Sequence, residues 1–171
     1  MNSYPKIGLF LKFAPLFLAL ICKTIWAADI PQGNVTDSRV INSPLDEPGS
    51  WLTYGQNFKE QRFSELTQIN TDTIARLGLA WTAQIGDYNM RMQGTPLVVD
   101  GVMYVSNGWS VIYALDATTG EEIWKYDPEV DRSYIRLACC GPAHNRGVAV
   151  YEGKVFVGTF DGRLIAVNAE T

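Results

Sequence analysis

Charge is scarce in this chain of 171 residues, since Asp, Glu, Lys and Arg together make up only 19%. The net charge is -4, which excludes the basic surface expected of a nucleic-acid-binding protein. Long apolar runs are also lacking, because residues 13–22 are too few for an ordinary membrane span and contain Pro15. Aromatic residues reach 12% and there are 15 glycines, so the composition excludes disordered, collagen-like and coiled-coil chains. It favours many short strands joined by tight turns.

The apolar run at residues 13–22 is typical of a secretory signal peptide. Lysines precede it and small residues follow it, as a charged region and a cleavage site would require. We expect cleavage after Ala27, because a cut one residue later would place the bulky Trp26 three residues before it. Residues 1–27 would then be removed, which predicts a periplasmic protein with no stable membrane span. An uncleaved anchor is the alternative, and a lipid on Cys22 is a weaker one.

Cysteine is scarce as well, and removal of the leader leaves only the adjacent Cys139 and Cys140. Disulfides can persist in an exporting compartment, but a bridge between neighbours closes almost no loop and adds little chain-entropy stabilisation. Its geometry is also strained, because the two α-carbons lie at the short end of the allowed range. Such a ring would form a rigid, flat, apolar turn able to press on something planar. Two small buried thiols are the alternative, and these considerations do not decide between them.

The part of the chain before residue 95 has weaker patterns. Residues 28–50 are rich in Pro, Asn, Asp and Ser without periodicity, which predicts an extended N-terminal segment. Residues 70–77 carry polar capping residues and are followed by Gly78, which predicts a short helix with a glycine stop. Residues 79–85 are predicted to form a strand.

An internal repeat begins near residue 95. At a gapless offset of 52 residues, Gly101 aligns with Gly153 and Ala114 with Ala166, which indicates a repeated supersecondary unit. Alternating apolar runs separated by turn residues such as Asp-Gly predict the strands. They are expected over residues 95–99, 102–106, 111–115 and 122–126, and again over 147–151, 154–159 and 163–168. Each unit of about four short strands is typical of a propeller blade; chance similarity between strand-rich segments is the alternative.

The turn that ends the first unit has a recognisable set of residues. Asp116 is expected to accept turn amide protons, Gly120 to take a positive φ, and Trp124 to pack on a neighbouring blade with its indole N–H satisfied. The matching glycine and tryptophan of the second unit would fall beyond Thr171. Because a propeller needs several blades to close, we expect a truncated propeller with exposed strand edges.

The chain from residue 50 onward resembles the N-terminal part of the quinoprotein alcohol dehydrogenases, which use pyrroloquinoline quinone (PQQ). The pair Cys139-Cys140 followed by Asn145-Arg146-Gly147 is the most specific part of this resemblance. The other segments that carry it are residues 51–55 with 60–64, residues 68–81, residues 95–124, and residues 161–166.

This resemblance implies an all-β fold, in which residues 51–171 form the first blades of an eight-bladed β-propeller with PQQ on its axis. Cys139 and Cys140 would then form a disulfide stacked on one face of PQQ. Arg146 would contact the anionic quinone, since a guanidinium fork suits carboxylate or quinone oxygens; a surface ion pair is the alternative. Gln93 takes the place of a glutamate that contacts the cofactor in the family, and it keeps hydrogen-bonding capacity without the charge.

A second departure from the family lies between the cysteines and Asn145. Four residues, 141–144, separate them where three are usual. The additional residue could bulge outward, or it could shift the disulfide relative to Arg146. His144, the single histidine, could reach the cofactor edge, although a loop histidine is more often solvated.

The family's activity gives the functional prediction. Its members bind calcium or a lanthanide as a Lewis acid, use an aspartate as general base, oxidise primary alcohols to aldehydes and pass electrons to a c-type cytochrome. By family order the metal ligands and the base lie beyond Thr171, so no catalytic or metal-binding residue is assigned in this chain. Asp100, Asp116 and Asp161 are expected to support turns instead.

Two function classes therefore stand. In the first, the complete gene product is a periplasmic PQQ-dependent alcohol dehydrogenase, and the 171-residue chain alone is inactive because it lacks most of the cofactor site. In the second, the propeller is a non-enzymatic scaffold or binding protein that has kept the blade motifs. The cysteine pair and Arg146 favour the first class, whereas Gln93 and the additional loop residue favour the second.

Overall fold

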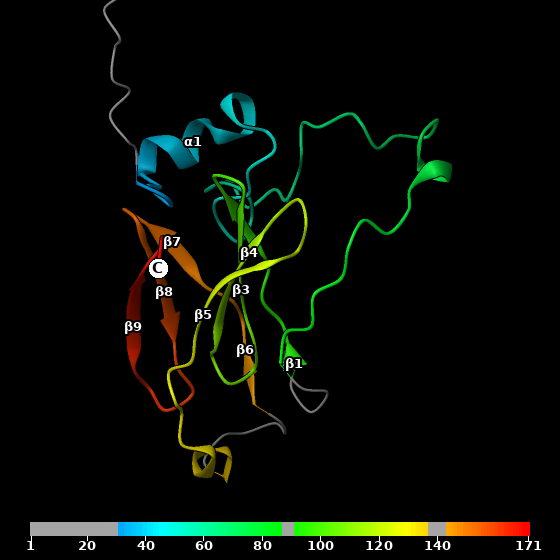
Figure 1. Cartoon of the computed structure of the whole chain (residues 1–171). Helices are drawn as coiled ribbons and strands as arrows, with labels where there is room; N and C mark the ends of the chain where they lie inside the picture. The colour runs from blue at the N-terminus through cyan, green and yellow to red at the C-terminus, as the bar shows by residue number, and fades with distance from the viewer. Residues whose placement is uncertain (1–30, 87–90, 137–142) are drawn as a thin grey trace, which may run out of the picture.

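The structure is a computed structural model that describes residues 31–86, 91–136 and 143–171 (Figure 1). The predicted signal peptide at 1–27, including Cys22, lies outside these residues. The described part contains one α-helix, two antiparallel sheets and one short parallel strand pair. The elements in chain order are α1 (Asp37–Asp46), η1 (Ile74–Arg76), β1 (Arg91–Met92), β2 (Leu97–Val99), β3 (Val102–Ser106), β4 (Ile112–Asp116), β5 (Glu122–Tyr126), η2 (Arg132–Arg136), β6 (His144–Asn145), β7 (Ala149–Tyr151), β8 (Lys154–Gly158) and β9 (Leu164–Asn168).

The two antiparallel sheets confirm the repeat. One has the strand order β2-β3-β4-β5 and the other β7-β8-β9, and the bounds of β7, β8 and β9 are those of β2, β3 and β4 moved by the repeat spacing. The pairing is also the same, since Leu97 lies opposite Tyr104 and Ala149 opposite Phe156. Both units begin with a hairpin whose two turn residues have positive φ, as the favoured two-residue turns require. All seven predicted strands of the repeat are thus confirmed, with ends that differ by at most two residues.

Strand β4 of the first sheet is buried on both faces, which explains its unbroken apolar run. Ile112 and Ala114 pack into a core shared with the second sheet, whereas Tyr113 and Leu115 pack on the opposite side. The shared core also takes Val35 and Val40 from the N-terminal segment and Leu52 just after it, so one apolar cluster joins three parts of the chain. Burial of this common surface holds the sheets side by side.

The contact between the sheets is the one predicted for Trp124. Its indole N–H donates to the carbonyl oxygen of Ala169, just after β9, at 3.1 Å. The hydroxyl of Tyr104 donates to the same oxygen at 3.1 Å, and burial raises the pKa of this tyrosine to about 12. The Trp124 and Tyr104 rings lie 6.0 Å apart between centroids. Two donors from the first sheet therefore converge on one acceptor from the second.

The turn before β5 is also confirmed. The Asp116 carboxylate accepts the backbone N–H groups of Thr118 and Thr119, both at 2.8 Å, and Gly120 has φ +77°. These hydrogen bonds lower the pKa of Asp116, with the Thr119 amide contributing most.

The prediction that residues 28–50 are extended is wrong, because this segment contains α1. Thr36 caps the helix by accepting the N–H of Arg39 on its side-chain oxygen. Pro44 lies inside the helix and cannot donate a backbone hydrogen bond, but the Ser43 hydroxyl donates to the Val40 carbonyl at 3.2 Å and supplies a partner there. The helix therefore accommodates Pro44, because a neighbouring side chain replaces the missing backbone donor.

Tertiary contacts dock this segment on the ends of both sheets. Arg39 donates to Glu47 at 2.7 Å and also pairs with Asp100 in the first hairpin turn, and its guanidinium lowers the pKa of Glu47. The carbonyl of Gly33 accepts the N–H of Gly153 in the second hairpin turn at 3.0 Å. The segment that leads into α1 thus bridges two equivalent turns and covers one end of the sheets (Figure 1).

The strand predicted over residues 79–85 is absent among the described residues, so that prediction is also wrong. Leu79 is 83% exposed, while Ala83 and Ile85 cover the second apolar face of the first sheet without joining its ladder. The helix predicted at 70–77 is reduced to the single 3₁₀ turn η1, which projects away from the sheets (Figure 1). No helix among residues that the structure describes is long and apolar enough to cross a membrane.

Candidate functional site

The two described candidate cofactor contacts lie beside each other because of a short parallel pairing. β1 pairs with β6, Met92 opposite Asn145, and the Gln93 N–H donates to the Asn145 carbonyl at 3.3 Å. Gln93 directly follows β1 and Arg146 directly follows β6, so both residues leave the same end of a parallel pair. Both side chains are exposed. The sequence did not predict this pairing, which joins residues far apart in the chain.

A close approach of two glycines lies next to these contacts. A Cβ atom placed on Gly94 would lie 2.7 Å from the Cα and 2.8 Å from the nitrogen of Gly147. Both of those atoms are backbone and cannot rotate away. Gly147 itself has φ +114°, a conformation that L side chains rarely adopt. Glycine at both positions lets the segments that carry Gln93 and Arg146 approach at backbone contact distance.

Asn145 connects this pair to both sheets. Its side-chain amide bonds to Ser106 at the end of β3, to Ser110 before β4 and to the Gly158 carbonyl at the end of β8. The same side chain accepts the N–H of Gly147 at 2.9 Å. Asn145 lies one repeat spacing after Gln93, a signal that could have marked it, but sequence reasoning assigned it no role.

Aromatic side chains from both units lie near the same strand ends. Trp109 lies in the loop between β3 and β4, and Phe160 lies in the equivalent loop between β8 and β9. Their ring centroids are 5.6 Å apart. The guanidinium of Arg132 lies 4.4 Å from the Trp109 ring centre, and the His144 and Phe160 rings form a T-shaped pair with centroids 6.3 Å apart. One contact of His144 in the structure is therefore with an aromatic ring of the second unit. Its predicted role at the cofactor edge stays a prediction.

Arg146 borders a hollow of about 320 Å³ between the two units. The hollow is lined mainly by apolar side chains and backbone, including Leu97, Phe156 and Leu164, with Tyr54 at its margin. The guanidinium of Arg62 lies 4.0 Å from the Tyr54 ring centre. A cation on a largely apolar wall can bind an anionic group without competition from a neighbouring carboxylate.

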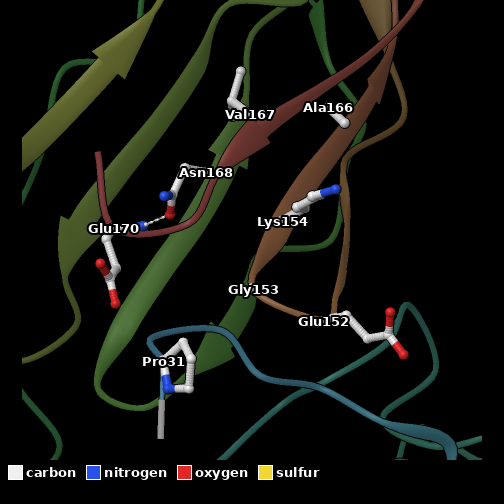
Figure 2. Close-up of a pocket in the computed structure, with 8 residues that line it drawn as sticks. All are labelled: Pro31, Glu152, Gly153, Lys154, Ala166, Val167, Asn168 and Glu170. Carbon is white, nitrogen blue, oxygen red and sulfur yellow. Dashed lines mark hydrogen bonds between the residues drawn. The ribbon is translucent and has the colours of Figure 1, made fainter. Parts of the chain in front are cut away.

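A larger hollow of about 460 Å³ lies elsewhere, along β9 and the Glu152-Gly153 turn (Figure 2). Its polar side chains are of mixed charge, and neither Gln93 nor Arg146 lines it. Among the described strands none pairs with the outer side of β9, where β5 lies in the first unit. This hollow therefore lies beside an edge strand and apart from the candidate cofactor contacts.

Asp116 and Asp161 support turns as predicted, whereas the carboxylate of Asp100 contacts the distant N-terminal segment. Asp100 bonds to the Gly33 N–H and to Arg39, and Asp161 bonds to the Thr159 hydroxyl and to Arg163. The Arg163 contact, followed by the Thr159 hydroxyl, lowers the pKa of Asp161 to about 2. Within the described ranges no three His, Cys, Asp or Glu side chains are grouped to hold a metal ion. Cys139 and Cys140 lie outside the described residues, so their disulfide and stacking role stay predictions.

Two repeated antiparallel sheets, joined by a tryptophan from one and a backbone acceptor in the other, are typical of adjacent β-propeller blades. Residues 51–171 match the family model described as the PQQ glucose/ethanol/alcohol dehydrogenase, beta-propeller domain. The chain belongs to this family of PQQ-dependent dehydrogenases.

Curated relatives agree with this assignment. The quinohemoprotein alcohol dehydrogenase ADH-IIG of Pseudomonas putida is 48% identical over 156 residues, covering 91% of this chain and 21% of the relative. The 1-butanol dehydrogenase (cytochrome c) of Thauera butanivorans is 50% identical over 123 residues, covering 72% of this chain and 18% of the relative. The chain thus spans about a fifth of the length of the curated relatives that it matches.

Solved structures give the same result. The structure of ADHIIG from Pseudomonas putida HK5 matches with a TM-score of 0.78 and 51% identity, over 84% of this chain and 20% of that one. A europium-containing methanol dehydrogenase matches with a TM-score of 0.68 and 39% identity, over 78% of this chain and 23% of that one. The strand-rich fold predicted from the sequence is therefore that of PQQ alcohol dehydrogenase propellers.

Proposed function

We propose that the complete gene product is a periplasmic dehydrogenase that oxidises primary alcohols to aldehydes with PQQ and passes the electrons to a c-type cytochrome. This chain would supply the N-terminal blades of an eight-bladed propeller. The observation that carries the proposal is the parallel β1–β6 pairing, which sets Gln93 and Arg146 side by side. Family membership and the names of the relatives support it.

The described residues fit an anionic planar quinone. Arg146 offers a fixed positive fork suited to carboxylate or quinone oxygens, and the Gln93 amide can donate or accept a hydrogen bond. Gly94 and Gly147 place no side chain beside them, so backbone lies close to the candidate binding residues. When bound, PQQ accepts the electrons released by alcohol oxidation. The part of this chain in that reaction is to bind and orient the cofactor.

Other parts of the proposal rest on residues outside the described ranges or outside this chain. Cys139 and Cys140 are proposed to form a disulfide against one face of PQQ. Calcium or a lanthanide is proposed to bind through ligands beyond Thr171, together with an aspartate base. Residues 1–27 are proposed to direct export. The 171-residue chain by itself is proposed to be inactive, because it contributes only part of the cofactor site.

The test is reconstitution of the complete gene product with PQQ and either calcium or lanthanum. We expect cytochrome c reduction that requires both a primary alcohol and PQQ, and none when either is omitted. A protein that binds PQQ yet reduces no acceptor with any primary alcohol would contradict the proposed reaction. A protein that binds no PQQ would favour the non-enzymatic scaffold.

A further inference from the structure

Asn145 uses the whole hydrogen-bonding capacity of its side chain. The residue is 9% exposed. Its Oδ1 accepts the Ser106 hydroxyl at 2.8 Å and the Gly147 N–H at 2.9 Å. Its Nδ2 donates to the Ser110 hydroxyl at 3.1 Å and to the Gly158 carbonyl at 2.9 Å. A primary amide offers two donor hydrogens and two acceptor lone pairs, and here all four are used.

These four partners come from both repeat units. Ser106 and Ser110 flank the loop between β3 and β4 of the first unit, and Gly158 ends β8 of the second. Because a buried amide with every group satisfied has one favoured orientation, its partners fix it from both sides. Shortening the side chain would leave the Gly158 carbonyl and the Gly147 N–H without this partner, in a region shielded from water.

The backbone and side chain of Asn145 also bear on the two candidate cofactor contacts. Its carbonyl accepts the Gln93 N–H at 3.3 Å. Its Oδ1 holds the N–H of Gly147, so the backbone of Arg146 lies between two positions that Asn145 determines. A single residue therefore connects the strand ends of both units to Gln93 on one side and to Arg146 on the other.

We propose that Asn145 is a positioning residue, which sets the geometry of the Gln93–Arg146 pair and acts on PQQ through Arg146 without touching the cofactor. This inference rests on the proposed function for its effect on PQQ, but its structural part can be tested in the cofactor-free protein. An acidic replacement keeps both acceptor interactions and loses both donor interactions, whereas alanine loses all four. The two variants therefore separate the acceptor interactions, with Ser106 and Gly147, from the donor interactions, with Ser110 and Gly158.

The first test is amide hydrogen exchange in the cofactor-free complete gene product. Asn145→Ala should speed exchange of the Gly147 amide at least tenfold, and Asn145→Asp should retain most of its protection. Asn57→Ala is the matched control, since Asn57 is also 9% exposed and accepts the Lys59 N–H at 2.8 Å in a similar turn. It should leave the Gly147 amide unchanged. Unchanged exchange at Gly147 in Asn145→Ala would overturn the inference whether or not the protein binds PQQ.

The second test is a double-mutant cycle on PQQ affinity in the same protein. Asn145→Ala should weaken binding at least tenfold, yet it should have little further effect in an Arg146→Ala background, because a positioning residue acts through the group that it positions. If the affinity losses of Asn145→Ala and Arg146→Ala multiply in the double variant, the two residues act independently and action through Arg146 is overturned. Full affinity in Asn145→Ala would overturn it as well. If the wild-type protein binds no PQQ, the proposed function fails and the exchange result alone decides the positioning role. Should Asn145→Ala not fold, Asn145→Asp supplies the exchange test: it should keep the Gly147 amide protected, and loss of that protection would overturn the inference.

Discussion

Replacing Gly94 by alanine is expected to weaken PQQ binding by the complete gene product on the order of 100-fold, since displacements near 1 Å at a binding site can have effects of that size. The added Cβ would lie 2.7 Å from the Cα of Gly147, so the two segments must separate. The hydrogen bond from the Gln93 N–H to the Asn145 carbonyl is already 3.3 Å long and would break. Gln93 and Arg146 would then no longer present their side chains with the geometry that one quinone requires. Equilibrium titration of the apoprotein with PQQ measures the effect.

Gly78→Ala is the matched control for this change. Gly78 is an exposed residue that follows the η1 turn, and a Cβ placed on it meets no atom within 4 Å. The same addition of one methyl group should therefore leave PQQ affinity within about twofold, as for an unstrained surface change. Equal affinities of the two variants would show that the close glycine approach does not matter to the cofactor.

Replacing Trp124 by alanine is expected to loosen the contact between the two units by on the order of 2 kcal/mol, below the range for fully buried tryptophans because this one is half-buried. The change removes the ring contact with Tyr104 and the hydrogen bond to Ala169. The amide of Ala169, which donates to the Gly153 carbonyl within the second unit beside the lost contact, should exchange about thirtyfold faster. Native-state hydrogen exchange on the complete gene product reads this directly.

Two further variants divide the effect of Trp124. Trp124→Phe keeps an aromatic ring but loses the indole donor, and the Tyr104 hydroxyl still satisfies the Ala169 carbonyl, so we expect a loss of no more than about 1 kcal/mol. Ile123→Ala is the neighbouring control on β5, where the exposed side chain should contribute less than about 0.5 kcal/mol. If Trp124→Ala behaves like Ile123→Ala, the tryptophan does not hold the units together.

The sequence predicted the repeat unit because local chemistry determines it. Two-residue turns such as Asp100-Gly101 and Glu152-Gly153 favour tight hairpins, and the alternating residues between them select the paired strands. Trp124 and Asp116 were also predictable, since an amphipathic indole and a turn carboxylate have few roles at those positions. These features depend on neighbours along the chain or on a regular spacing.

The failures have a shared physical cause, which is dependence on distant residues. The strand predicted at 79–85 would need a partner strand, and its apolar residues instead cover a face of the first sheet. Helix α1 was missed because Pro44 obscured its pattern, while the Arg39 contacts with Asp100 that dock it join residues far apart in sequence. The same limit hid the role of Asn145, whose partners lie in both units.

For the site, sequence resemblance named Gln93 and Arg146, but it gave no reason for them to meet. The parallel β1–β6 pairing, the Gly94–Gly147 approach and the Asn145 amide supply that reason. The pairing is only two residues long in each strand, too short for any periodicity to reveal. The roles of Cys139 and Cys140 stay predictions of the resemblance.

The central claim is that this chain binds PQQ through Arg146, and equilibrium binding of PQQ to the complete gene product tests it most directly. We predict that the wild-type protein binds the quinone and that Arg146→Ala weakens binding on the order of 10- to 100-fold, the loss expected for a charge-assisted hydrogen bond. Arg76→Ala, which removes the same charge from the exposed η1 turn, should change the affinity less than about twofold. Absence of binding in the wild type, or equal affinity in wild type and Arg146→Ala, would contradict the account.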